Sequence, residues 1–437
     1  IAVSIEDGDE DSSGPITSTI AVTSVAPDPI YVDDDFSGSI GDSIADADGG
    51  SSVSPATLGV SAFTNITDAL GAVTPTGTII VNDGDYSSEA VSLTDTVTLQ
   101  LTGSGGTSGG STVTIASLAS DAGVTGPVVD LGKETLVTGG ATDTAYEGTI
   151  SGTGGNLTKV GTGRFTLRNT TTHTGTTTVN EGFLRIGHVV TPLIIGTLDG
   201  DGPVVVNSPG ALEFAVGTDL TQTQTGVISG TGEVIKLADG TLIFDGPSGN
   251  TFSGGFELGD GGGSLFDGTS GVKEGFVVLN HSDHLGTGLV HSRGAQLQAG
   301  SSGIVIPNDF EIDAGGFRLG GSNDFELSGT ITNINNDPRG WGNYGLEGLN
   351  LTFSGTAVLP TTTGTLNFEG SEGKDNGTWT ITGDITGIGS VLFQNNFDNG
   401  IVTISGTNTY SGTTVVNTAV VGGTLIFNGS HTGGSNY

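Results

Sequence analysis

The sequence predicts an all-β solenoid, because short strand-like segments recur along it with one grammar. The pattern is clearest over 148–187 and returns near 226–258, 327–368 and 402–428. Each unit consists of short runs of alternating apolar and polar residues separated by Gly, Asn and Thr, which is typical of strands that stack on neighbouring repeats. Glycine supplies 79 of 437 residues, more than twice the usual share of about 7%. This composition favours thin apolar layers joined by tight turns.

Residues 1–29 are predicted to form a separate, extended and acidic segment. A Thr-rich, β-branched run follows the first acidic cluster and is bounded by prolines, which indicates one strand without a hairpin partner. An unpaired strand seeks the edge of a sheet, in its own molecule or in a neighbour. We therefore predict that this strand is donated to a partner through Ile16, Ile20, Val22 and Val25.

Residues 30–111 are predicted to form an N-terminal cap and the first coils, and 112–437 the body of the solenoid. The spacing of Ile66, Leu70 and Val73 predicts a short helix with one apolar face. Strand-like segments follow it, from Gly77 onward. This succession resembles the opening of right-handed parallel β-helices, in which a short helix covers the first coil. Repeat arrays need such a cap because their first apolar layer would otherwise face water.

The formal net charge of −36 is unevenly distributed, since no Lys or Arg precedes Lys133. Such a field repels phosphate backbones and anionic lipid headgroups. We therefore expect neither nucleic acids as partners nor insertion into a membrane. The chain contains no Cys, which excludes disulfides, Cys-based metal sites and thiol nucleophiles. An acidic surface rich in Thr and Gly is compatible with an extracellular location of the protein.

The repeat grammar resembles a known family, the autotransporter-associated β-strand repeat, also called the passenger-associated transport repeat. The resemblance rests on Leu157-Thr-Lys-Val-Gly-Thr-Gly-Arg-Phe-Thr-Leu167 and on Asn408-Thr-Tyr-Ser-Gly-Thr-Thr-Val415, and weaker similarity extends over most of 148–437. It implies a right-handed parallel β-helix of a secreted or surface-exposed bacterial protein. His173 stands where the family usually has Tyr. A passenger fragment of an autotransporter is one alternative under this resemblance.

Several acidic clusters have the spacing of oxygen ligands around Ca²⁺. We predict calcium at two places, the first formed by Asp7, Asp9 and Asp11 and the second, near the cap, formed by Asp33, Asp35, Asp46 and Asp48. The first cluster lacks the Gly and the bidentate Glu of an EF-hand loop, and a solvated acidic tail is the alternative interpretation. His281, His284 and His291 form a weaker candidate site for a transition metal.

The sequence predicts that the chain is not an enzyme. Parallel β-helices include polysaccharide lyases and hydrolases, but the Arg residues here are scattered and paired catalytic carboxylates are not evident. The least repeat-like stretch, 335–344, is predicted to be a loop that carries Arg339, Trp341 and Tyr344. Aromatic rings and an Arg on a loop can stack against sugars or a protein partner. The alternative is a loop that covers the rod.

Taken together, these features predict an extracellular structural or adhesive protein that forms a rod. The sharper hypothesis is a subunit of a filament, in which rods associate head to tail through the donated N-terminal strand. The alternative from a different class is a carbohydrate-binding or carbohydrate-active β-helix whose site is the loop of Arg339, Trp341 and Tyr344.

Overall fold

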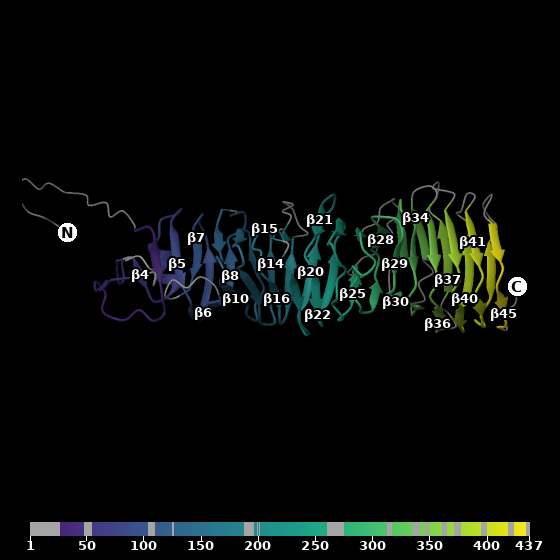
Figure 1. The fold of residues 1–437 in the computed structure, drawn as a ribbon, viewed down its shortest axis with the longest axis horizontal. Helices are drawn as coiled ribbons and strands as arrows, with labels where there is room; N and C mark the ends of the chain where they lie inside the picture. The colour runs from purple at the N-terminus through teal and green to yellow at the C-terminus, as the bar shows by residue number, and fades with distance from the viewer. Residues whose placement is uncertain are drawn as a thin grey trace, which may run out of the picture.

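The chain winds into an elongated parallel β-solenoid (Figure 1). The computed structural model describes residues 27–47, 55–103, 110–124, 126–187, 196–198, 200, 202–259, 275–312, 317–334, 341–345, 349–360, 365–370, 377–394, 400–417 and 424–433. Within these residues every ladder is parallel except the pairing of β2 (Ser43–Ile44) with β3 (Ala56–Thr57). The predicted all-β solenoid is therefore confirmed.

Three long sheets form the faces of the N-terminal part. The eight-stranded sheet runs in the spatial order β18 (Thr197–Leu198), β15 (Thr170–Thr171), β12 (Thr149–Ser151), β9 (Val128–Asp130), β7 (Thr98–Thr102), β5 (Thr78–Asn82), β1 (Ile30–Val32) and β4 (Ala62–Phe63). The seven-stranded sheet contains β22 (Ile228–Gly230), β19 (Val204–Val206), β16 (Thr177–Val179), β13 (Asn156–Lys159), β10 (Thr135–Thr138), β8 (Thr112–Ser120) and β6 (Gly84–Leu93).

The third face is continuous through most of the rod. This eleven-stranded sheet contains β11 (Thr144–Tyr146), β14 (Arg164–Leu167), β17 (Phe183–Ile186), β20 (Ala211–Ala215), β23 (Glu233–Leu237), β25 (Phe256–Leu258), β27 (Val290–Ser292), β30 (Phe310–Ile312), β33 (Ile331–Asn333), β36 (Ala357–Leu359) and β39 (Ile385–Gly387). Because chain order passes from one sheet to the next, as in β12, β13 and β14, each coil here supplies one strand to each face.

Two further long sheets form the other faces of the C-terminal part. The nine-stranded sheet contains β21 (Thr221–Gln224), β24 (Thr241–Phe244), β26 (Phe276–Leu279), β28 (Gln296–Ala299), β31 (Phe317–Gly321), β34 (Trp341–Gly345), β37 (Thr365–Gly370), β40 (Ser390–Gln394) and β43 (Thr414–Asn417). The six-stranded sheet contains β29 (Ile304–Ile306), β32 (Phe325–Leu327), β35 (Asn350–Phe353), β38 (Thr378–Ile381), β41 (Ile401–Ile404) and β44 (Thr424–Phe427). A short ladder joins β42 (Thr407–Asn408) to β45 (Ser430–His431).

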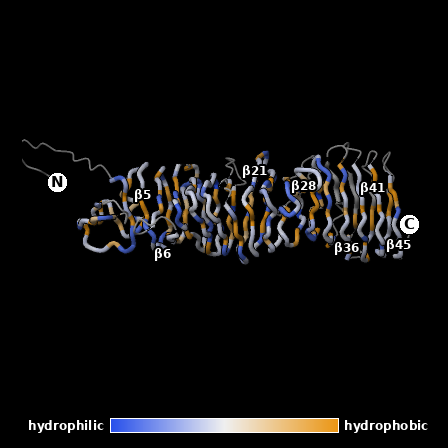
Figure 2. Tube along the Cα trace, viewed as in Figure 1, coloured by the Kyte–Doolittle hydropathy of each residue, from blue (hydrophilic) through white to orange (hydrophobic). Residues whose placement is uncertain are grey.

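The main core is a column of apolar side chains that follows the rod axis, and a small second cluster of Ala47, Ala56, Leu58 and Ala62 lies near its N-terminal end. The column continues from Ile30 to Tyr410 and is built by strands in which buried and partly exposed residues alternate. Neighbouring coils place like residues on top of one another, as Ile79, Leu99 and Val129 show. Figure 2 shows this as hydrophobic positions recurring from strand to strand. Alternation with period two, repeated coil after coil, therefore produces a continuous interior.

The predicted short helix is confirmed as α1 (Ile66–Ala72). The side chain of Asn65 caps it by accepting the N–H of Asp68, and the carboxylate of Glu89 accepts the N–H groups of Ile66 and Thr67. Ile66 is buried, while Leu70 and Val73 are partly buried against the main core. The helix packs against β6 and β1 at the N-terminal end of the rod. Its role as a cap stays a prediction.

The length of a coil varies between repeats. Facing residues are 20 apart in sequence at Thr78 and Thr98, 28 apart at Leu351 and Trp379, and 35 apart at Leu242 and Val277. The register of the inward-facing residues is kept in all three cases, so the extra residues lie in the connections between strands.

Candidate functional site

Of the predicted calcium residues near the cap, the structure brings Asp33 and Asp35 together and adds Asp34. One carboxylate oxygen of each lies within 4.8 Å of the others. Asp46 is exposed and outside this group, and Asp48 lies outside the described residues, as do Asp7, Asp9 and Asp11. Part of the cluster's acceptor capacity is used within the protein, because Asp33 accepts a bond from Asn82 Nδ2 at 2.9 Å. Binding of Ca²⁺ stays a prediction.

Tyr86 joins this cluster to the first coils. Its hydroxyl donates to the carbonyl of Asn82 at 3.3 Å and accepts the N–H of Asp34 at 3.2 Å. Burial raises the pKa of Tyr86 far above its usual value, and the negative charges of Asp34 and Asp33 raise it further. The hydroxyl therefore stays neutral and works as a hydrogen-bonding link below the carboxylates.

The stretch predicted to be a loop with a binding site contains a strand instead. Trp341 and Tyr344 belong to β34, which lies between β31 and β37, and the backbone of Trp341 faces that of Phe317. The prediction of a loop was wrong for these two residues, because the ladder on either side supplies a strand register that their Gly- and Asn-rich sequence does not display. Arg339 lies outside the described residues. Glycan binding by these residues stays a prediction. Donation of the N-terminal strand also stays a prediction, because Ile16, Ile20, Val22 and Val25 lie outside the described residues.

The histidines considered for a transition metal have structural contacts. Nδ1 of His284 accepts the N–H of His281 at 3.1 Å, and Nε2 of His284 lies 3.3 Å from the carbonyl of Gly246. His284 is buried, and burial is the main reason that its pKa is lowered. Both ring nitrogens are thus in contact with backbone groups, while His291 lies beside Glu311, with 3.6 Å between Nδ1 and Oε2. The three rings do not form one ligand set among the described residues.

Three corners of the solenoid share one hydrogen-bond pattern, and sequence reasoning recognised only two of them. At each corner a Thr donates its N–H to an Ile one coil earlier, in the pairs Thr172 to Ile150, Thr251 to Ile228 and Thr409 to Ile385. Two residues later a Ser or Thr donates to a Gly, in the pairs Thr174 to Gly152, Ser253 to Gly230 and Ser411 to Gly387. The missed corner reads Asn250-Thr-Phe-Ser-Gly254, which repeats Asn408-Thr-Tyr-Ser-Gly412 with Phe in place of Tyr.

A buried Asn secures two of these corners. Asn250 Oδ1 accepts the N–H of Ile228 at 2.8 Å, and Asn408 Oδ1 accepts the N–H of Ile385 at 3.0 Å. The residue two positions later points into the core as Phe252 or Tyr410. Each corner therefore joins two coils through a side-chain bond and a ring at once, which makes it the structural unit of the repeat.

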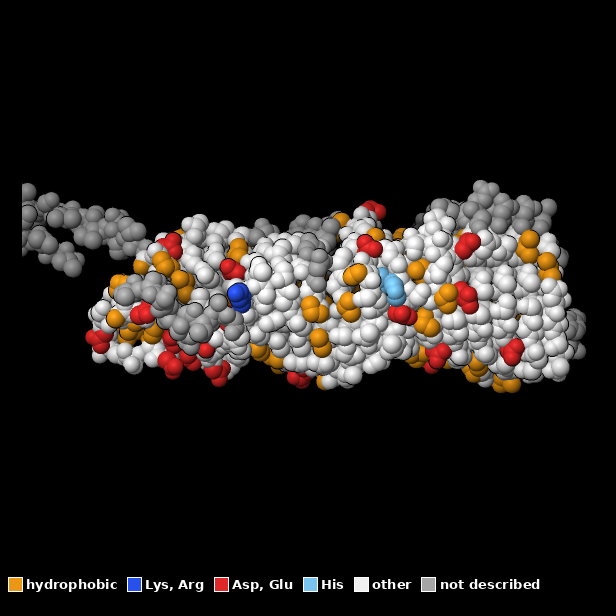
Figure 3. Space-filling view, viewed as in Figure 1, with side chains coloured by type: hydrophobic (Ala, Val, Ile, Leu, Met, Phe, Trp, Pro, Cys, Tyr) orange, Lys and Arg blue, Asp and Glu red, His pale blue; other side chains and the backbone are white. Residues whose placement is uncertain are grey.

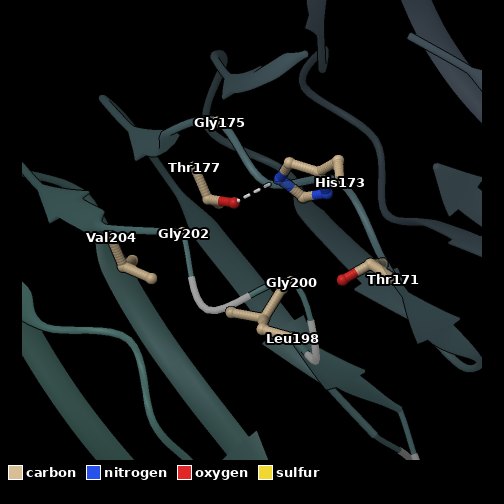
Figure 4. Close-up of a pocket in the computed structure, with 8 residues that line it drawn as sticks. All are labelled: Thr171, His173, Gly175, Thr177, Leu198, Gly200, Gly202 and Val204. Carbon is tan, nitrogen blue, oxygen red and sulfur yellow. Dashed lines mark hydrogen bonds between the residues drawn. The ribbon is translucent and has the colours of Figure 1, made fainter. Parts of the chain in front are cut away.

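His173 occupies the ring position at the third corner. Its Nε2 lies 2.8 Å from Thr177 Oγ1 (Figure 4), and the Tyr410 hydroxyl lies 2.5 Å from Thr414 Oγ1, which is also four residues later. A small hollow beside the imidazole is lined by Thr171, His173, Gly175, Thr177, Leu198, Gly200, Gly202 and Val204. Only 4% of the His173 surface is exposed, and burial lowers its pKa to about 4. The imidazole is therefore neutral at neutral pH.

Two buried lysines hold turns together from within. Lys159 Nζ donates to the carbonyls of Val160 at 2.7 Å, Gly161 at 2.6 Å and Glu181 at 3.1 Å. Lys236 Nζ donates to Leu237 and Ala238 in the same way. Burial lowers the pKa of Lys159. The Lys of the repeat thus satisfies carbonyl groups at a turn.

An ion network lies across three strands of the eleven-stranded sheet. Glu213, of which 4% is exposed, accepts Nε of Arg164 at 2.8 Å and Nε of Arg185 at 2.7 Å. Arg164 also contacts Asp143 at 3.2 Å and lies over the ring of Phe183, 5.0 Å from its centroid. The hydrogen bond and charge of Glu213 raise the pKa of Arg164 despite burial. A buried carboxylate between two guanidinium groups is compensated, so this network joins coils.

A second charged group lies farther along the same sheet. Glu257, His291 and Glu311 face one another on successive strands, and Arg293 Nε is 2.9 Å from Glu257 Oε2. Glu233 lies beside Glu257, and its pKa is raised to about 6, mainly by burial and then by the charge of Glu257. Glu233 and Glu257 are thus neighbouring carboxyl groups, and Glu233 keeps its proton below about pH 6.

We expect Glu233→Gln to stabilise the protein at pH 7.5 and to have little effect at pH 4. The folded-state pKa of about 6 lies above the ordinary 4.5, so the folded state retains the proton that the unfolded state loses. Stability is therefore lost as pH rises from 4.5 through 6. We expect a gain of about 1 kcal/mol, because solvent screening reduces the full linkage value. Chemical denaturation at both pH values measures it, and an equal effect at both would contradict the assignment.

The outward surface is acidic because basic side chains are largely used inside. Lys159, Lys236 and Arg318 are buried, and Arg164, Arg168, Arg185 and Arg293 pair with carboxylates. Figure 3 shows acidic groups along one face, gathered most densely toward the N-terminal end. The expectation that polyanions are poor partners follows from this arrangement, and it stays untested.

Comparison with known proteins agrees with the repeat analysis. Residues 157–186 and 398–421 match the family model of the passenger-associated transport repeat. No curated protein and no solved structure gives a significant match. The first match spans β13 to β17, with Lys159 and His173, and the second contains the corner of Tyr410. The molecule is thus a parallel β-solenoid in which two segments match the passenger-associated transport repeat. None of its described helices is long and apolar enough to cross a bilayer.

Proposed function

We propose that the chain is an extracellular structural rod that associates with further copies of itself head to tail. The observation that carries this proposal is the architecture, since one apolar column runs from Ile30 to Tyr410. Its corners, Lys159 and its ion network all join one coil to the next. The hydrogen bonds, ion pairs and apolar packing of the described interior thus support a continuous rod. That the chain is not an enzyme stays a prediction.

Location outside the cell is supported by the family match. Passenger-associated transport repeats suggest a secreted or surface-exposed passenger. The acidic exterior and the lack of Cys and Met suit an oxidising medium. Self-association is supported by the Thr-rich apolar run at 16–25, which has the sequence of a strand and no neighbouring hairpin partner.

We expect deletion of residues 1–26 to abolish filaments while the rod stays folded. The deletion retains Asp28, whose side chain accepts the N–H of Thr78 at 2.9 Å, and it removes no residue of the described core. Negative-stain microscopy and sedimentation of the full and shortened chains measure assembly, and circular dichroism verifies folding. Filaments of unchanged length from the shortened chain would contradict strand donation. A parallel sample in EDTA determines whether divalent ions hold the filaments together.

A further inference from the structure

The ring of His173 carries a buried nitrogen to which no described residue bonds. Its Nε2 lies 2.8 Å from Thr177 Oγ1, but its Nδ1 is shielded from solvent and has no hydrogen-bond partner within the described part of the chain. In a neutral imidazole one nitrogen donates and the other accepts, so both need a partner when the ring is buried. A buried polar atom without a partner is costly, because it has given up the hydrogen bond that solvent provides in the unfolded chain. The corner of His173 therefore lacks one hydrogen bond.

The hollow beside this ring has the size of a single small molecule. The space in which the centre of a water molecule can lie is about 10 Å³, which is roughly the minimum for one water. Three of the lining residues, Gly175, Gly200 and Gly202, have no side chain to fill it. Figure 4 shows that the imidazole points Nε2 at Thr177, while Thr171 lies on the side of the ring that carries the other nitrogen. The unbonded nitrogen thus belongs to a ring that borders a space for one molecule.

The hollow offers polar partners to an occupant. The hydroxyl of Thr171 donates its hydrogen to the carbonyl of Thr197 at 2.9 Å, across the step from β15 to β18, and its oxygen keeps lone pairs that accept a further bond. The interior is also polar one coil farther along, because β21, which contacts β18, buries Gln222 and Gln224. Apolar cavities stay dry, whereas a polar cavity that supplies two or more partners holds water. This hollow is of the second kind.

The corner of Tyr410 explains why space is left at His173. The Tyr410 hydroxyl lies beside Thr414 Oγ1, and the His173 ring lies beside Thr177 Oγ1, so both rings reach a hydroxyl four residues later. An imidazole is smaller than a phenol, and it makes the same contact while it occupies less of the corner. The difference in volume between the two side chains is left as the hollow.

We propose that the hollow is a binding site for one water molecule, which bridges Nδ1 of His173 and Oγ1 of Thr171. Because the Thr171 hydroxyl uses its own hydrogen on Thr197, the water donates one hydrogen to Thr171 and the other to Nδ1. Nδ1 is then the acceptor of the ring, and Nε2 carries the proton and donates it to Thr177. The result is a chain of hydrogen bonds from Thr177 through the imidazole, the water and Thr171 to the next coil at Thr197.

High-resolution crystal structures of the full native chain and of His173→Tyr test the site directly. In the native protein we expect one ordered water within hydrogen-bond distance of both Nδ1 of His173 and Oγ1 of Thr171. In His173→Tyr the larger ring takes the place of the water, so the density should disappear. A native structure in which the hollow is dry, or in which a protein group bonds to Nδ1, would overturn the proposal.

Nuclear magnetic resonance of the chain with ¹⁵N-labelled histidine tests the same site in solution. The chain has six His, and the His173 signals are assigned by their loss in His173→Tyr. We expect the proton on Nε2, and we expect Thr171→Val to shift the Nδ1 resonance because the variant removes one partner of the water. The matched control is Thr170→Val, on the same strand but outside the hollow, which should leave that resonance unchanged. A proton on Nδ1, or equal shifts in the two folded variants, would contradict the bridge, and thermal melting verifies that both are folded.

Discussion

Replacing Gly230 by Ala should destabilise the rod by about 4 kcal/mol. Gly230 ends β22 with a φ of +105°, which L side chains rarely adopt, and it accepts the N–H of Ser253 at the missed corner. A Cβ there would lie 2.1 Å from the carbonyl oxygen of Val206 on the coil before. The backbone strain contributes about 1–2 kcal/mol, and displacement of the Val206 strand contributes the rest.

The matched control for this substitution is Gly303→Ala. Gly303 also has a positive φ, +81°, but a Cβ there meets no heavy atom within 4 Å. It therefore measures the backbone term alone, about 1 kcal/mol. Thermal and chemical denaturation give the two free energies of unfolding, and hydrogen exchange along β19 and β22 shows whether the damage is local, as repeat arrays allow. Equal losses for the two variants would show that the contact with Val206 does not determine the stability of the corner.

Gly387→Ala should reproduce the effect of Gly230→Ala. Gly387 holds the same place before the corner of Tyr410, with a φ of +109°, and its Cβ would lie 2.2 Å from the carbonyl oxygen of Leu359. Two corners 157 positions apart thus impose the same requirement on the backbone. Both corners share a Gly with positive φ whose carbonyl accepts an N–H from the next coil, and we regard this as the defining feature of the repeat.

Local patterns were sufficient to predict the class of the fold. Alternating residues such as those around Leu157 and Val402 reveal inward and outward faces, and the spacing of Ile66, Leu70 and Val73 reveals α1. The corner of Asn250 was missed although its letters repeat those of Asn408, because the ring residue differs. The strand of Trp341 was missed since its register is imposed by neighbouring coils.

Contacts between coils were not predictable from the sequence alone. Arg164 and Glu213 are 49 residues apart in sequence and lie two strands from each other in the sheet. The sequence separation that brings two such residues together depends on the lengths of the connections between the strands. The connections vary from coil to coil, so the partner of a given charge follows only from the actual register. Asp34 lies with Asp33 and Asp35 because the three residues are consecutive, whereas Asp46 lies outside this cluster.

Acidification should destabilise the rod through His173, by as much as about 3 kcal/mol between pH 6.5 and pH 4. Burial lowers the folded-state pKa from 6.5 to about 4. Between these values the unfolded state binds a proton that the folded state does not, so stability is complete above 6.5 and falls as pH falls toward 4. The size follows from the shift at 1.36 kcal/mol for each pKa unit.

The informative variant is His173→Tyr, which places at this corner the residue that occupies it at Tyr410. The phenol can bond to Thr177 as Tyr410 bonds to Thr414, and the larger ring can extend into the hollow bounded by Gly200 and Gly202. Because a Tyr does not titrate near pH 5, the variant should lose this part of the pH dependence and match or exceed the stability of the native chain at pH 7. Denaturation of both proteins at pH 4, 5.5 and 7 measures the difference. Parallel pH profiles for the two chains would show that the acid sensitivity of the rod arises elsewhere. If His173 causes it, the native chain must lose stability at the pH at which the exposed imidazole of the unfolded chain binds a proton and the buried one does not.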